Sequence, residues 1–249
     1  SERIIKSMRN VVVLNGGRGA GSLIPALLDE PDFNVTSIVN AFDDGKSTGE
    51  IRHFFKMLGP SDIRKVQELM LPKSDPDYKA ALHLFRHRFA ESISNQIAFK
   101  EISDFVKGER LDLVGARFTS DIKNNSLRLV LDNFLKCLGT IEKLRGEKFN
   151  FSDCAIMNCI YAGTFIQLKR DLEKASRLID RLFRLKGSVI PTSNENKHLI
   201  GLRENGEVLY SEAEIVELRS NVKIDRIYLL DEPLEKEYFE KLTLKEKRY

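Results

Sequence analysis

Tryptophan, paired cysteines and long apolar runs are all missing from this chain of 249 residues. The three cysteines, Cys137, Cys154 and Cys159, form no Cys-x-x-Cys pair, which argues against a disulfide framework or a structural zinc site and suits a reducing compartment. No apolar run approaches the ~20 residues that a membrane helix needs. Residues 1–9 contain no hydrophobic signal segment, so we expect a cytoplasmic protein.

A strong charge of one sign is missing too. The 40 Lys and Arg residues nearly balance the 37 Asp and Glu residues, which leaves a net charge of +3. So small a charge does not call for a nucleic acid, and without Trp only Phe and Tyr are left to stack on bases. We therefore expect a small-molecule partner rather than a nucleic acid or a membrane, and we leave a homodimer open.

A glycine-rich segment follows the first apolar run of the chain. Residues 11–14 (VVVL) predict a buried parallel strand, and residues 22–28 predict an amphipathic helix. Between them lie Gly16, Gly17, Gly19 and Gly21. A strand, a glycine turn and a helix bring backbone N–H groups up to a phosphate, and these glycines exceed what a tight turn needs. The segment therefore predicts a phosphate or nucleotide site.

Two common nucleotide motifs do not fit this turn. A classical NAD site would need an acidic residue after the second strand, residues 35–39, where Asn40 stands instead. No Lys-Ser or Lys-Thr follows Gly21, and Gly45-Lys46-Ser47 lacks the glycine five positions earlier that a Walker A loop needs. The sequence thus argues against both motifs.

Two adjacent carboxylates, Asp43 and Asp44, lie in the loop of residues 40–49 after the second strand. Open α/β sheets bind ligands at this edge, so the pair is a candidate Mg²⁺ site that faces a diphosphate. The alternative is an ordinary Asp-Asp-Gly turn before a capped helix. The neighbouring glycine turn favours the functional interpretation.

Three further polar residues stand at positions that allow a functional or a structural role. Asp62 and Arg64 lie in the first turn of a predicted helix. Asp62 is either a plain N-cap or part of the site, and Arg64 pairs either with Asp62 or with a ligand phosphate. Asn158 lies inside the apolar helix predicted for residues 152–168, where it faces either a ligand cleft or a neighbouring backbone group.

The hydrophobic periodicity predicts an α/β fold: a mostly parallel sheet with flanking helices, a helical insertion and a C-terminal β-hairpin. Residues 1–90 form the nucleotide-binding half, residues 91–150 the insertion, and residues 151–249 complete the same domain. The later predicted helices span residues 97–106, 124–137, 152–168 and 171–185, the strands residues 188–191, 198–203, 207–210 and 224–230, and a charged helical tail residues 234–249.

Several of these segments, in this order, resemble the 2-phospho-L-lactate transferase / gluconeogenesis-factor family (CofD/YvcK-like). The segments are residues 15–21, Asp43-Asp44-Gly45 with residues 47–49, residues 59–64 (GPSDIR), residues 84–89 (LFRHRF), Asn158, and residues 186–194 (KGSVIPTSN). The LFRHRF segment resembles the gluconeogenesis-factor branch more closely.

The resemblance implies a Rossmann-like domain that binds a nucleotide-diphosphate-linked ligand. In the transferase branch, a phospholactyl-type group moves from a guanosine diphosphate-linked donor to a deazaflavin precursor with Mg²⁺. The other branch binds UDP-sugars and affects carbon metabolism and cell-wall synthesis. We therefore expect either a transferase of phosphorus-containing groups or a non-catalytic UDP-sugar-binding regulator.

Carried over by position, the resemblance implies that the glycines cradle phosphate, that the three aspartates lie beside a metal or diphosphate, and that Asn158 touches the ligand. The candidate catalytic residues are Asp43, Asp44 and Asp62, with Asp43 and Asp44 as Mg²⁺ ligands, and the candidate ligand-binding residues are Gly16, Gly17, Arg18, Gly19, Lys46, Ser47, Arg64 and Asn158.

This chain departs from the family pattern at several positions. Arg18 stands where Thr is usual, and Lys46 replaces a Gly; Ser61 and Met157 also replace glycines. The added positive charge strengthens anion binding or takes over the role of the metal. The family continues after its hairpin into a strand and a Gly-Pro-Gly-Ser-type loop that nothing here matches. Either the chain is a fragment of a longer protein, or its site is incomplete.

Overall fold

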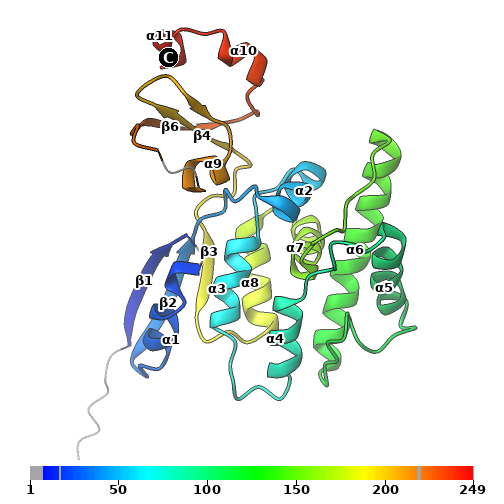
Figure 1. The fold of residues 1–249 in the computed structure, drawn as a ribbon. Coiled ribbons are helices and arrows are strands. Elements are labelled where there is room, and N and C mark those ends of the chain that lie inside the picture. The colour runs from blue at the N-terminus through cyan, green and yellow to red at the C-terminus, as the bar shows by residue number, and fades with distance from the viewer. Residues whose placement is uncertain (1–7, 17, 218–219, 249) are drawn as a thin grey trace, which may run out of the picture.

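The computed structural model describes residues 8–16, 18–217 and 220–248. A parallel sheet with the strand order β1-β2-β3 carries the fold (Figure 1). Its strands are β1 (Arg9–Asn15), β2 (Phe33–Val39) and β3 (Ser188–Pro191). Val13 pairs with Ser37, and Ser37 pairs with Val189, so the strands are in parallel register across the sheet. The first predicted strand is therefore confirmed as a parallel strand. The prediction that it is buried is wrong for one of its faces, because β1 lies at the edge of the sheet.

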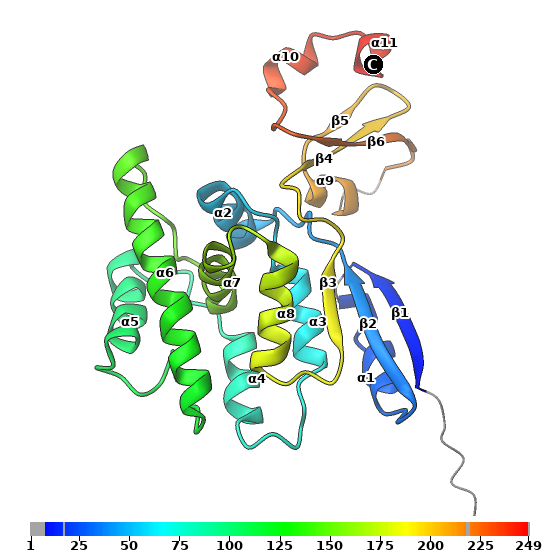
Figure 2. The same ribbon diagram turned by 180° about the vertical axis from the view of Figure 1, so that it is seen from behind.

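Helices α1 (Leu23–Leu28) and α3 (Ser61–Leu69) pack against this sheet and against each other, and α8 (Leu172–Leu182) packs along β3 (Figures 1 and 2). Successive side chains along a strand point to opposite faces of the sheet. Val13 and Val35 are accordingly buried, whereas Val12 and Leu14, on the other face of β1, are exposed. The predicted α/β class, with helices that flank a parallel sheet, is confirmed.

The remaining helices form a layer beside the sheet. They are α2 (Lys46–Phe55), α4 (Tyr78–Arg86), α5 (Asn95–Lys107), α6 (Asp121–Arg145) and α7 (Ile156–Gln167). Helix α7 lies at the centre of the layer, with every residue from Ile156 to Phe165 buried. It crosses α6 so closely that a Cβ on Gly163 would stand 1.8 Å from the carbonyl oxygen of Val130. None of the described helices is both long and apolar enough to span a membrane.

The C-terminal segment forms a second sheet above the carboxyl ends of the parallel strands (Figures 1 and 2). The predicted hairpin is confirmed, and the last strand pairs antiparallel with it to give the order β5-β4-β6. Its elements are β4 (His198–Arg203), β5 (Val208–Leu209), α9 (Glu212–Glu217) and β6 (Ile224–Leu230). The helical tail predicted for residues 234–249 is two short helices, α10 (Lys236–Glu240) and α11 (Leu244–Lys247).

Two predicted helices have different boundaries in the structure. The helix expected over residues 124–137 spans Asp121–Arg145. The helix expected from residue 152 begins at Ile156, with Ala155 as its N-cap. Asp153 has a positive φ of 52° and bonds to Arg88 instead, so it does not cap the helix. The hydroxyl of Ser152 donates to the carbonyl oxygen of Glu91, 2.8 Å away. The chain before α7 therefore follows tertiary contacts with residues 88–91 rather than a helical cap.

Candidate ligand-binding site

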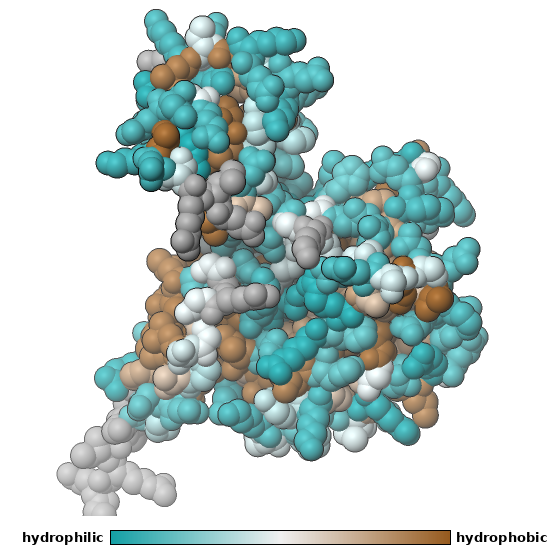
Figure 3. Space-filling model, in the orientation of Figure 1, coloured by the Kyte–Doolittle hydropathy of each residue, from teal (hydrophilic) through white to brown (hydrophobic). Residues whose placement is uncertain are grey.

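A cleft of about 810 Å³ opens at the carboxyl ends of β1 and β2, where α9 approaches from the C-terminal sheet. The space-filling view shows the surface hollowed between that sheet and the rest of the molecule (Figure 3). The lining residues are Gly16, Asp43, Gly45, Thr48, Ser61, Asp62, Lys65, Arg88, Asp153, Glu212 and Val216. The cleft thus joins parts of the glycine turn, the acidic loop and the start of α3, as the sequence predicts for a parallel sheet.

The glycine turn meets the cleft directly after β1. Gly16 lines the cleft, and the turn continues into a short 3₁₀ helix, η1 (Arg18–Ala20). A Cβ on Gly16 or Gly19 would meet no atom within 4 Å, so the space in front of these backbone groups is open. Three predicted ligand-binding residues cannot be placed here: the structure does not describe Gly17, nor the side chains of Arg18 and Lys46.

The carboxylate of Asp43 is held at the cleft by the start of α2. Its Oδ1 accepts from the backbone N–H of Gly45 at 3.1 Å, and its Oδ2 accepts from the hydroxyl of Thr48 at 3.1 Å. The loop also passes very close to Gly59, where a Cβ would stand 2.3 Å from the carbonyl oxygen of Asp43. Gly59 therefore permits the approach of the acidic loop to the segment that leads into α3.

Asp44 is not among the residues that line the cleft. Its Oδ2 accepts from the backbone N–H of Glu212 at 3.3 Å, and its Oδ1 is buried with no hydrogen-bond partner among the described residues. The two adjacent aspartates thus have different surroundings. Asp43 faces the cleft, whereas Asp44 links the acidic loop to α9.

Asp62 and Glu212 add two more carboxyl groups to the cleft. Burial is the main cause that raises the pKa of Asp62, and the charge of Asp43 adds to it, while Lys65 at 2.8 Å acts in the opposite direction. Burial also raises the pKa of Glu212, with further contributions from Asp43, Asp62 and Asp44. The cleft therefore concentrates negative potential that a cation would relieve. No group of three His, Cys, Asp or Glu side chains in the described chain forms a ready-made metal cage.

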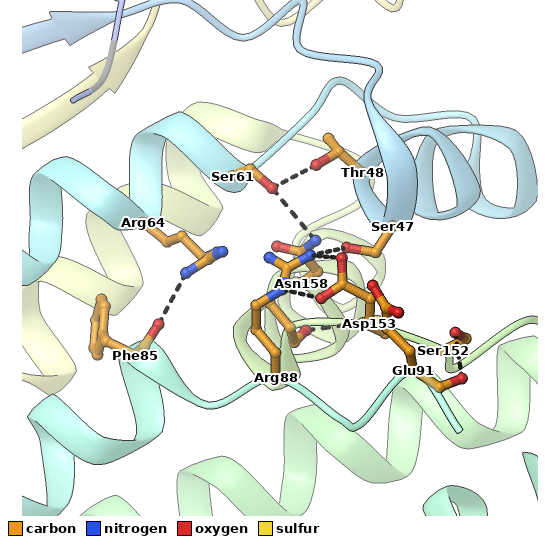
Figure 4. Close-up of polar contacts among 12 residues, drawn as sticks. Ser47, Thr48, Ser61, Arg64, Phe85, Arg88, Glu91, Ser152, Asp153 and Asn158 are labelled. Atoms are coloured by element: carbon orange, nitrogen blue, oxygen red, sulfur yellow. Dashed lines mark hydrogen bonds and ion pairs between the residues drawn. The ribbon is translucent and has the colours of Figure 1, made fainter. Parts of the chain in front are cut away.

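Positive charge enters the cleft from Lys65 and Arg88. The sequence allowed Arg64 to pair with Asp62 or with a ligand phosphate. In the structure, Lys65 forms the ion pair with Asp62. The guanidinium of Arg88 donates to both carboxylate oxygens of Asp153, at 2.6 and 2.9 Å, and to the hydroxyl of Ser47 at 3.2 Å (Figure 4). The hydrogen bond to Asp153 raises the pKa of Arg88, so this side chain carries its charge permanently.

Asn158 lies behind the cleft wall. It is completely buried and is not among the lining residues. Its Nδ2 donates to the hydroxyl of Ser61 at 3.4 Å, and the Ser61 and Thr48 hydroxyls are hydrogen-bonded to each other (Figure 4). A chain of contacts therefore runs from Asn158 through Ser61 and Thr48 to Asp43.

Four charged lining residues were not singled out from the sequence: Lys65, Arg88, Asp153 and Glu212. Arg88 belongs to the LFRHRF segment, so its motif gave a signal. Asp153 and Glu212 gave none, because each reaches the cleft only through contacts with distant parts of the chain.

Comparison with known proteins identifies the family. A family model described as 2-phospho-L-lactate transferase CofD matches residues 11–241. The chain belongs to this family. The CofD match covers the glycine turn, the acidic loop, α3, α7 and most of the C-terminal segment, so it agrees with the resemblance found in the sequence.

Relatives of this CofD-family chain carry a different name. A "Putative gluconeogenesis factor" of Thermotoga maritima is 24% identical over 225 residues, which is 90% of this chain and 51% of the relative. A "Gluconeogenesis factor" of Listeria monocytogenes is 41% identical over 80 residues, 32% of this chain and 23% of the relative. The chain thus spans about half of the Thermotoga protein.

A solved structure shows the same fold. The crystal structure of a UPF0052-family protein from Bacillus halodurans has a TM-score of 0.59 and 22% sequence identity. The similarity covers 93% of this chain and 55% of that protein.

Proposed function

We propose that the cleft binds a nucleotide-diphosphate-linked small molecule. The observation that supports this proposal is the lining of one cleft by the Gly16 backbone, the Asp43 carboxylate and the Lys65 ammonium group. Backbone groups after a first parallel strand and charged groups after a second suit a diphosphate that lies across the carboxyl ends of both strands.

Mg²⁺ fits the acidic side of the cleft. Asp43 offers carboxylate oxygens there, and Asp62 faces the same space. Mg²⁺ prefers one or two protein carboxylates together with phosphate oxygens, which agrees with a site that has no protein cage of its own among the described residues. When bound, the ion neutralises charge on a diphosphate. Asp44 supports this arrangement from behind, through its bond to the backbone of Glu212.

We further propose that the chain uses this cleft to transfer a phosphorylated group. An acceptor oxygen forms a bond to the phosphorus that bears the group, and the bond from that phosphorus to the bridging oxygen breaks. The electron pair leaves with the bridging oxygen on a nucleoside monophosphate, and the proton of the acceptor hydroxyl passes to water. Lys65 and Arg88 hold positive charge beside the reacting phosphates. The cleft also lowers the barrier by holding the acceptor and the donor in the orientation that the reaction needs.

A second function is binding without turnover, as in a UDP-sugar-binding regulator of carbon metabolism or cell-wall synthesis. Two observations favour it. Lys65 and Arg88 already place positive charge in the cleft, so a diphosphate has counter-charges without a metal. The relatives from Thermotoga and Listeria carry the name gluconeogenesis factor.

A thermal-shift screen separates these functions. Guanosine diphosphate, uridine diphosphate and a UDP-sugar are added with and without Mg²⁺, and each ligand that binds stabilises the fold by about 2.7 kcal/mol at a hundredfold excess over its Kd. A guanosine diphosphate shift that requires Mg²⁺ supports the transferase. A UDP-sugar shift without Mg²⁺ supports the regulator. A flat screen contradicts the proposal that the cleft binds such ligands.

A further inference from the structure

A second pocket of about 310 Å³ lies beside the cleft, between α3 and the end of α4. It shares Lys65 and Arg88 with the cleft, but it contains none of the aspartates that line the cleft. The residues that line it are Gly21, Arg64, Lys65, Glu68, Leu69, Arg86 and Arg88. Four cationic side chains therefore surround one carboxylate.

Three of these cations have a carboxylate of their own. The Nε atom of Arg86 donates to Glu68 at 2.6 Å, Arg88 bonds to Asp153, and Lys65 bonds to Asp62. These ion pairs use Glu68 and both neighbouring aspartates. They leave Arg64 as the lining cation without a carboxylate partner among the described residues.

Arg64 is also the most deeply placed of the four. Its residue is 5% exposed, one guanidinium nitrogen donates to the carbonyl oxygen of Phe85 at 2.9 Å, and its Nε has no partner among the described residues (Figure 4). Burial and the charge of Arg88 lower the pKa of Arg64 to about 10, so the side chain still carries a proton at neutral pH.

A buried charge without an opposite charge is costly, and a guanidinium presents several N–H donors in one plane. The buried Arg64 guanidinium would therefore be stabilised by an anion with several acceptor oxygens. A phosphate group meets it, since each of its oxygens can accept from a different cationic side chain.

We propose that this pocket is a phosphate subsite, in which Arg64 binds the anion from below while Arg86 and Lys65 bind it from the rim. The phosphate belongs either to the ligand in the adjoining cleft or to a separate small phosphate compound. The first source would make the subsite part of the proposed function and the second would not, but inorganic phosphate tests the subsite in both cases.

The test measures inorganic phosphate binding by isothermal titration calorimetry and thermal shift, with chloride at the same ionic strength as the reference. The wild-type chain binds phosphate, and Arg64→Gln weakens that binding at least about tenfold, the effect of one lost charge-assisted hydrogen bond. Because a buried arginine also contributes to packing, Arg86→Gln is the second variant. Its side chain is 64% exposed, so its loss leaves the fold intact while phosphate binding weakens.

Arg177→Gln is the matched control. Arg177 forms a similar surface ion pair with Glu173 at 2.8 Å, on α8 and outside the pocket, and its loss leaves phosphate binding unchanged. The proposal is overturned if chloride stabilises the wild-type chain as much as phosphate does. It is equally overturned if Arg64→Gln and Arg86→Gln both bind phosphate with wild-type affinity.

A third variant, Asp43→Asn, separates this proposal from the proposed function. Asp43 is outside the pocket, so the variant retains phosphate binding even where Mg²⁺-dependent nucleotide binding is lost. If the wild-type chain binds phosphate but none of the nucleotides tested, the result supports the subsite and contradicts the proposed function. Competition between phosphate and nucleotide assigns the subsite to the nucleotide's own phosphate, whereas additive binding assigns it to a separate compound.

Discussion

Three side-chain atoms around the cleft and its neighbouring pocket are buried without a hydrogen-bond partner among the described residues: Asp44 Oδ1, Arg64 Nε and Asn158 Oδ1. An unsatisfied buried polar group costs roughly 1–3 kcal/mol. Arg64 lines the pocket, whereas Asp44 and Asn158 are not among the residues that line the cleft but contact residues that do. Buried polar groups left without a partner call for an explanation, and the proposed ligand binding is one that mutation tests.

Asn158 gives the sharpest test of this idea, because it is too buried to touch a ligand. We expect Asn158→Ala to weaken nucleotide diphosphate binding about tenfold by loosening Ser61, and through it Thr48 and Asp43. Asn124→Ala is the control: Asn124 also has a buried, unpartnered Oδ1, and its Nδ2 donates to Phe118 far from the cleft. Calorimetric titration of both variants decides. Equal losses of affinity would show that Asn158 has only a general role in folding.

Asp180 predicts a pH dependence of stability. Its carboxylate is buried and accepts from Gln67 and from the backbone of Val189, and burial raises its pKa from 3.8 to about 6. Between these two values the folded state binds more protons than the unfolded state, so the free energy of unfolding falls as the pH rises through this window, by about 3 kcal/mol at most.

Urea unfolding at pH 4 to 7 measures this contribution. The wild-type chain loses more stability across the window than Asp180→Asn, which has no charge to bury. Parallel pH profiles for the two proteins would show that Asp180 titrates normally.

At the scale of elements, the local pattern predicted most of the fold. Ser94, Ser120 and Asp171 each cap a helix close to its expected start, because the cap acts through neighbouring backbone N–H groups. Asp153 also lies near the start of a predicted helix and is of a residue type that commonly caps helices. The Asp153 carboxylate instead accepts a hydrogen bond from Arg88, 65 positions away in the sequence. A local sequence pattern cannot predict a contact between residues so far apart. The pairing of β6 with β4 is likewise decided by tertiary contacts.

The crossing of α6 and α7 depends on Gly163. A methyl group there would meet the backbone of Val130, so Gly163→Ala forces the helices apart and costs about 1–3 kcal/mol or more. Gly139→Ala is the paired control within α6, where a Cβ meets no atom within 4 Å and the better helix former adds about 0.5–1 kcal/mol. Chemical denaturation compares them. Similar stabilities for the two variants would mean that the helices do not cross as closely as described.

At the scale of the whole molecule, the cleft gathers groups from the entire chain. Gly16 and Asp43 lie in the loops that follow two parallel strands, Arg88 and Asp153 lie in segments between helices of the layer, and Glu212 lies in the C-terminal segment. The sequence predicted the first two because strand ends meet at one sheet edge. It could not predict Glu212, whose backbone reaches Asp44 across 168 positions.

One titration tests the proposed function most directly: guanosine and uridine diphosphate binding to the wild-type chain with and without Mg²⁺, beside Asp43→Asn. Asp132→Asn is the control, since Asp132 pairs with Lys136 on the surface of α6. We expect Mg²⁺ to strengthen nucleoside diphosphate binding. Asp43→Asn should weaken binding in the presence of Mg²⁺ at least about tenfold, and Asp132→Asn should leave it unchanged. Binding of equal strength with and without Mg²⁺, and in Asp43→Asn, would contradict the metal-carboxylate site, and no binding at all would contradict the nucleotide cleft.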